Sequence, residues 1–247
     1  MRNIRIIVEY DGTNYSGWQI QQNAPSIQEE IQNSIKKITG ENINLIGAGR
    51  TDAGVHAKGQ TANFHTSSSI PSEKFAWALN SVLREDIVIK QSAEVSDKFH
   101  SRYDAKSKIY SYTIHRGVFP PAIMRYYVYH VNNGRQIDLK KMKKAAECFE
   151  GTHNFRGFMS TGSSVMDTVR TIYNIRIVED GDYIKIFYHG NGFLYNMVRI
   201  ITGTLLYASM EKIKTEYIPD IIKEGTRELA GITAPAHGLC LEKVYYE

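Results

Sequence analysis

The chain has 247 residues, of which 42% are hydrophobic and 23% charged, with a formal net charge of +4. This composition is ordinary for a soluble globular protein and excludes a disordered chain, a collagen and a coiled coil. Two isolated cysteines outside any CxxC pair exclude a disulfide framework and a cysteine-rich zinc site. No stretch approaches the ~18 consecutive apolar residues of a membrane span, and no signal peptide is recognisable. We therefore expect a cytoplasmic protein without a membrane partner.

The first half of the chain mixes strand and helix patterns. Alternating apolar and polar residues predict a strand over 3–10, which an Asp-Gly turn ends. Ser26 and Glu29 form a capping box, and isoleucines at helical spacing then predict a helix that stops at Gly40. The other elements expected in this half are strands over 43–46, 60–66 and 86–95 and a helix over 72–83.

The second half repeats this plan loosely. The elements expected there are a strand over 108–115, a hairpin of 171–178 with 183–189, and helices over 138–149, 196–208 and 218–224. Strands and helices alternate without a regular βαβ rhythm, which favours the α+β class over a doubly wound sheet. We expect two similar α/β halves, residues 1–105 and 106–247.

The basic charge is concentrated in the second half. Residues 1–103 are neutral, and residues 98–144 carry eleven basic but only two acidic side chains, interleaved with eight aromatic ones. A nucleic-acid groove requires cations that contact phosphates and also flat rings that stack on bases. The lysine-rich helix at 140–144, taken by itself, is more simply a solvated face.

A glycine-rich loop over residues 47–60 carries one carboxylate, Asp52. The loop matches neither the dinucleotide fingerprint nor the P-loop. In an extended segment Arg50 points to the same side as Asp52 and would keep that carboxylate ionised, as a nucleophile or base requires. Residue types alone favour a simpler interpretation, in which Asp52 caps its own turn. His56 and His65 lack metal-binding spacing, so we expect ordinary hydrogen-bonding histidines and no metal.

Five segments of the chain carry a family resemblance. GRTDAGVHAKGQ, around Asp52, resembles the active-site motif of the tRNA pseudouridine synthase A family. The other segments that look like this family, in the same order, are YDGTNYSGWQ, FHSRYDAKSKIYSY, GNGFLYNMVRIITGT and APAHGLCLEKVYY. The resemblance covers essentially the whole chain and overturns the turn interpretation of Asp52. Ala48 stands where the family usually has serine, and Ala236 where it usually has proline. These departures leave open whether the protein is the main enzyme of this family or a diverged paralogue.

The resemblance implies a fold and a reaction. The fold is that of pseudouridine synthases, in which two α/β halves with mixed, mainly antiparallel sheets join around a central cleft. The reaction is isomerisation of uridine to pseudouridine at three adjacent positions of the anticodon stem-loop of tRNA. The resemblance also implies a homodimer that needs no cofactor.

Individual residues match the family pattern. Asp52 matches the catalytic carboxylate, by attack on the sugar or by assisted elimination. Tyr110 matches the tyrosine that stacks on the flipped-out base, and Arg199 the arginine that pairs with the aspartate. Arg50 matches the arginine associated with displacing the base. From the basic stretch, the residues that we expect to bind the substrate are Lys98, Arg102, Lys106 and Lys108.

Two other functions use the same features. An N-glycosidase would cut the same bond with water, but most such enzymes need a second carboxylate as general acid, which Asp104 or Asp167 would have to supply. A non-catalytic RNA-binding module would explain the aromatic residues, but no RNP-type run is present. Release of free uracil would support the first, and any turnover would exclude the second.

Overall fold

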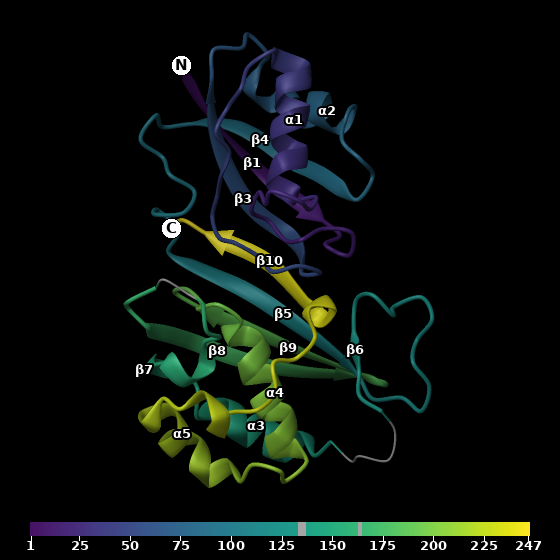
Figure 1. The fold of residues 1–247 in the computed structure, drawn as a ribbon, viewed down its shortest axis with the longest axis vertical. Coiled ribbons are helices and arrows are strands. Elements are labelled where there is room, and N and C mark those ends of the chain that lie inside the picture. The colour runs from purple at the N-terminus through teal and green to yellow at the C-terminus, as the bar shows by residue number, and fades with distance from the viewer. Residues whose placement is uncertain (133–136, 163–164) are drawn as a thin grey trace. The chain divides into compact units, whose positions relative to one another are not determined.

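The computed structural model describes residues 1–132, 137–162 and 165–247, which form two compact units (Figure 1). The first unit is Met1–Lys106 with Cys240–Glu247, and the second is Ser107–Leu239. Residues 240–247, which the sequence analysis placed in the second half, therefore belong to the first unit. Within that unit, Cys240 and Leu241 pair with His56 and Ala57.

The sheet of the first unit is built around β1 (Arg2–Tyr10), confirming the strand expected there. β1 is antiparallel both to β3 (His56–Thr66) and to β4 (Ile87–Val95). The short β2 (Ile46–Gly47) and the parallel β10 (Leu239–Tyr245) also pair with β3. Alternation along β1 places Ile4, Ile6 and Val8 in the core, each with no exposed surface.

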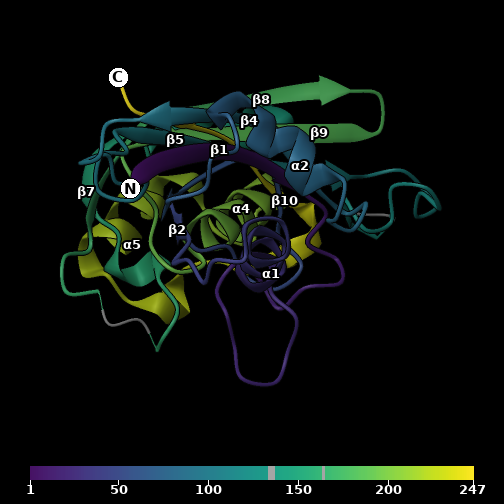
Figure 2. The ribbon, with the colours of Figure 1, turned by 90° about the horizontal axis from the view of Figure 1, so that it is seen from above.

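Two helices accompany this sheet. In α1 (Ile27–Thr39) the Ser26 side chain accepts the Glu29 N–H, and Gly40 ends the helix in the left-handed region at φ 76°, as expected. Three isoleucines of α1 are fully buried, and Figure 2 shows this helix on one side of the β1 sheet. The helix expected over 72–83 is shorter, because a 3₁₀ turn over Ser72–Lys74 precedes α2 (Phe75–Asn80).

The strand expected over 43–46 is largely absent, and side chains of α1 explain why. Gln28 donates to the Leu45 carbonyl at 2.8 Å, and the Leu45 N–H donates to the Gln32 side chain at 3.2 Å. The backbone of Leu45 thus finds its hydrogen bonds outside a ladder, and only β2 remains of the strand.

The sheet of the second unit runs in the order β5 (Ser107–His115), β9 (Tyr183–Gly190), β8 (Val169–Asp180), β7 (Gly151–Asn154), with every neighbour antiparallel. β6 (Tyr129–His130) adds a short parallel pair to β5. The expected hairpin of β8 and β9 is confirmed.

Three helices complete the second unit, close to the expected positions. They are α3 (Leu139–Glu147), α4 (Met197–Ser209) and α5 (Ile218–Glu224). The Asp138 carboxylate caps α3 by accepting two backbone N–H groups of its first turn. α4 is buried on nearly all sides, which matches its apolar composition. The α+β class is confirmed, and no described helix is long and apolar enough to cross a membrane.

Candidate functional site

Asp52 lies in the irregular loop between β2 and β3 of the first unit. Its side chain is half-buried, and its carbonyl accepts the Val55 N–H at 3.1 Å, which closes a tight turn. Arg50, two residues before Asp52, is exposed. The backbone position of Asp52 is set by this loop.

A second segment, residues 10–18, holds this loop on both sides of Asp52. Before Asp52, the Tyr10 hydroxyl is 2.8 Å from the Thr51 hydroxyl, and the Trp18 N–H donates to the Thr51 carbonyl at 3.0 Å. After Asp52, the Gly54 N–H donates to the Tyr15 carbonyl at 3.3 Å. Backbone hydrogen bonds of this kind constrain a loop more tightly than side-chain contacts, because the main chain itself is fixed.

Two glycines make this close approach possible. Gly17 has φ +98°, and a Cβ placed on it would lie 2.4 Å from the Thr51 carbonyl oxygen. A Cβ on Gly12 would lie 2.0 Å from the Val55 carbonyl oxygen. Any larger residue at either position must displace the loop that carries Asp52. The family-like segment YDGTNYSGWQ thus has a structural role that its residue types alone did not reveal.

His56 anchors the end of the same loop. His56 is buried, and its Nδ1 atom accepts the backbone N–H of Gly12 at 3.1 Å. The same Nδ1 atom lies 3.1 Å from a carboxylate oxygen of Asp11. Asp11 also accepts the Thr13 N–H at 2.9 Å. His56 is thus a hydrogen-bonding histidine. Among the described residues, no group of three or more His, Cys, Asp or Glu side chains could hold a metal ion.

Tyr110 lies in the second unit, in the middle of β5 opposite Tyr188 of β9. Only 8% of its surface is exposed. The ring of Phe193 meets the Tyr110 ring edge-on, with centroids 5.3 Å apart and an interplanar angle of 85°. Phe193 was not singled out from the sequence, although it lies within the family-like segment GNGFLYNMVRIITGT.

Arg199 lies in the first turn of α4, and its side chain has two identified acceptors. Its Nε donates to the Ala234 carbonyl and its Nη1 to the Asn196 side chain, both at 2.7 Å. The Ala234 N–H returns a bond to the Arg199 carbonyl at 3.1 Å. Burial raises the pKa of Tyr112 well above its usual value, and the positive charge of Arg199 partly opposes that shift in pKa. The guanidinium therefore has a fixed direction.

The basic stretch does not form one continuous element. Lys98, Arg102 and Lys106 are exposed on the connection after β4 in the first unit, whereas Lys108 is half-buried on β5 in the second. Tyr112 of the stretch is fully buried and packs in the core of the second unit. One further basic position, residue 135, lies outside the described residues.

The two candidate second carboxylates have local structural roles. Asp104 accepts the His100 N–H at 2.8 Å, and Asp167 accepts the Val169 N–H at 2.9 Å. Both carboxylates therefore serve as acceptors in their own turns, which weighs against an assignment as the general acid of a glycosidase.

Comparisons with known proteins agree on one family. The family model described as tRNA pseudouridine synthase matches residues 6–104 and 145–247. The chain is 52% identical to tRNA pseudouridine synthase A of Thermoanaerobacter sp. strain X514 and 51% identical to that of Acetivibrio thermocellus. It is 50% identical to tRNA pseudouridine synthase A 2 of Clostridium perfringens. Each alignment spans 246 residues and covers 100% of both proteins.

Proposed function

Because this chain belongs to the tRNA pseudouridine synthase family and is an isomerase of tRNA uridines, we propose that it acts on the anticodon stem-loop with Asp52 as its catalytic carboxylate. The reaction breaks the bond between the uracil N1 and the ribose C1′ and forms a bond from C5 to C1′. The C5 proton is lost and N1 gains one, so the product has the mass of the substrate.

A uridine stacked in a stem cannot present its glycosidic bond to a side chain. It must be flipped out, which costs a few kcal/mol of unstacking free energy. Asp52 then acts at the sugar, either by attack on C1′ or by assisting elimination. Both routes need an ionised carboxylate held in one position.

The observation that carries the assignment of Asp52 is the support of its loop. Hydrogen bonds from residues 10–18 hold the chain immediately before and after Asp52. Effective catalysis by a side chain requires placement to within a fraction of an ångström, and a loop rarely achieves this without such support.

Tyr110 and Arg199 are proposed to serve the same reaction from the second unit. The Tyr110 ring, oriented by Phe193, would stack on the flipped base, and its hydroxyl would help to remove the C5 proton. Arg199, whose direction is fixed by Ala234 and Asn196, would hold the charge of Asp52. Arg50 would assist in displacing the base from its stack.

Phosphate contacts are proposed for the exposed side chains of Lys98, Arg102 and Lys106 and for the half-buried Lys108. Binding through them would weaken steeply as salt rises, because each phosphate contact releases condensed counterions. We further propose that the enzyme is a cytoplasmic homodimer that uses no cofactor; sedimentation of the purified chain tests the dimer.

Substitution Asp52→Asn tests the central assignment. With tRNA tritiated at uridine C5, the wild-type enzyme should release tritium, and the variant should release none while binding tRNA within a few fold of wild type. Asp220→Asn, an exposed aspartate on α5, is the matched control and should leave release unchanged. Persistent tritium release by Asp52→Asn would remove Asp52 from the chemistry, and free uracil would indicate a glycosidase.

The anticodon stem-loop is tested separately. Pseudouridines can be mapped in tRNA from cells with and without this protein. Sites lost only from the anticodon stem-loop would support the proposal, and sites lost only elsewhere in tRNA would contradict it.

A further inference from the structure

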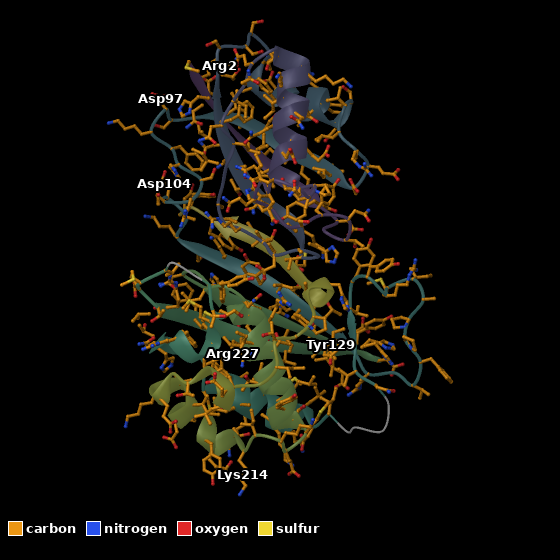
Figure 3. The ribbon with its side chains drawn as sticks, viewed as in Figure 1. Arg2, Asp97, Asp104, Tyr129, Lys214 and Arg227 are labelled. Atoms are coloured by element: carbon orange, nitrogen blue, oxygen red, sulfur yellow. The ribbon has the colours of Figure 1, made fainter. Side chains whose placement is uncertain are left out.

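The turn that follows β4, residues 97–106, presents an exposed aromatic stack; we call it the Tyr103 turn. Tyr103 is 74% exposed. The His100 ring stacks on it with centroids 4.2 Å apart and an interplanar angle of 30°. The Arg102 guanidinium lies 5.7 Å from the Tyr103 centroid. Figure 3 labels Asp97 and Asp104, which lie on this turn of the first unit.

Hydrogen bonds inside the turn hold the stack in place. The His100 Nδ1 atom accepts the backbone N–H groups of both Arg102 and Tyr103 at 3.2 Å. The Asp104 carboxylate accepts the backbone N–H of His100 at 2.8 Å. The imidazole is therefore fixed beneath the phenol ring, and the turn does not need to order itself when a ligand arrives.

Further hydrogen bonds fix the turn to the rest of the first unit. Ser101, which is fully buried, donates its N–H to Asn63 at 2.9 Å and accepts the Tyr246 hydroxyl at 2.8 Å. The Asn3 side chain donates to the carbonyls of Ser96 and Phe99, both at 2.9 Å. Preorganisation of this kind lowers the entropic penalty of binding.

The charges around the stack favour an anionic ligand. Three exposed cations of this turn, Lys98, Arg102 and Lys106, face solvent. These cations outnumber the two carboxylates of the turn, of which Asp97 lies 3.2 Å from His65 and Asp104 accepts the backbone N–H of His100. A largely exposed flat ring beside several cations matches a nucleobase with its phosphate. The apolar ring of this turn, Phe99, packs against Tyr246.

We propose that the Tyr103 turn is a stacking platform for an unpaired base of the tRNA, separate from the uridine that is isomerised. The base lies on the open face of Tyr103, and Arg102 contacts the adjoining phosphate. The proposal rests on the proposed function, because tRNA is the ligand.

The platform is tested by equilibrium binding of the full chain to an unmodified tRNA transcript. Tyr103→Ala should weaken binding about ten-fold, which is within the range expected for the loss of one base–aromatic stack. Tyr103→Trp keeps a flat ring, so its affinity for tRNA should stay within about three-fold of wild type. Trp77→Ala removes a ring that is 76% exposed on α2 of the same unit and should have no effect.

Two further measurements separate this proposal from the others. At saturating enzyme, the single-turnover rate of Tyr103→Ala should equal that of wild type, since the ring does not take part in the chemistry. Arg102→Gln should lower the slope of log Kd against log salt concentration by the amount expected for the loss of one phosphate contact. Tyr103→Ala should leave this slope unchanged.

Specific outcomes would overturn the platform. Unchanged tRNA affinity in Tyr103→Ala would do so and would leave Asp52 as the catalytic carboxylate. A loss of affinity accompanied by a change in sedimentation would show that the ring contacts a second copy of the chain. Equal losses in the Ala and Trp variants would show that the phenol hydroxyl, and not stacking, makes the contact.

Discussion

The two units hold their proposed functional groups in different ways. In the second unit, Tyr110 and Arg199 stand on a strand and a helix, whose regular backbones set the direction of each side chain. In the first unit, Asp52 stands on an irregular loop, and residues 10–18 supply the order that the loop lacks. A functional group on a loop therefore depends on a remote segment of the chain, and substitutions in that segment should affect activity without touching the substrate.

The largest effect should come from Gly17→Ala. The new Cβ would collide with the Thr51 carbonyl, and alanine resists the positive φ of this position. Displacement of Asp52 by about 1 Å should lower turnover roughly 100-fold. Tritium release under single-turnover conditions measures it, with tRNA affinity recorded in parallel.

Gly40→Ala is the matched control for that substitution. Gly40 also has a positive φ, but a Cβ on it would meet no atom within 4 Å. It should therefore lower stability by about 1 kcal/mol and leave turnover unchanged. Equal activity losses in the two variants would show that general destabilisation, and not the loop, is responsible.

Tyr110→Phe should have an effect of similar size, on turnover more than on binding. The ring and its contact with Phe193 remain, whereas the hydroxyl that would remove the C5 proton is lost. The rate should fall by roughly two orders of magnitude, as for loss of a general base. An unchanged single-turnover rate would remove the phenol from the mechanism.

Tyr112→Phe provides the comparison on the same strand. The Tyr112 hydroxyl donates to the Pro235 carbonyl at 2.7 Å, so its loss should lower the free energy of unfolding by about 1 kcal/mol. Turnover of the folded enzyme should stay near wild type, because the hydroxyl is engaged in the interior. Urea unfolding and tritium release distinguish the two variants.

Thr51→Val should have a smaller effect, because it removes only the hydrogen bond between the Thr51 and Tyr10 hydroxyls. The backbone hydrogen bonds of the loop remain. Loss of the bond to Tyr10 should lower stability by about 1 kcal/mol. Tyr10→Phe should give a similar loss, and the double variant should lose less than the sum. Additive losses would show that the two hydroxyls do not stabilise each other.

The smallest effect concerns acid stability in the second unit. His115 is buried, and its Nδ1 atom lies 3.0 Å from the Nδ1 atom of His130. Burial lowers the pKa of His115, and the neighbouring His130 lowers it further. The charge of Asp182 partly opposes this shift in pKa. Because the folded protein binds this proton less readily than the unfolded chain, stability should be intact above about pH 6.5 and fall as pH drops through the lowered pKa.

Hydrogen exchange at pH 7.5 and 5.5 measures this acid effect strand by strand. Amides of β5 should lose protection in acid more than amides of β1, and His130→Asn should reduce the loss. Both tryptophans, Trp18 and Trp77, lie in the first unit, so fluorescence would not detect the change. Equal losses of protection in β1 and β5 would contradict the assignment to His115.

Much of the local structure could be predicted from periodicity and capping residues. The strand at 3–10 and the helix between Ser26 and Gly40 were confirmed because neighbouring residues determine both patterns. The strand expected over 43–46 was wrong, because glutamines of α1 took the hydrogen bonds of Leu45. The roles of Asp52, Tyr110 and Arg199 stay predictions that the experiments above test.

The α+β class, most elements and the family could be predicted from residue order along the chain, because neighbouring residues carry their patterns. Chain packing was needed to show that residues 240–247 belong to the first unit, that Gly17 lies against the Thr51 carbonyl, and that the His100 ring stacks on an exposed Tyr103. The physical reason is the same in each case: distance in space and exposure to water depend on how the whole chain packs.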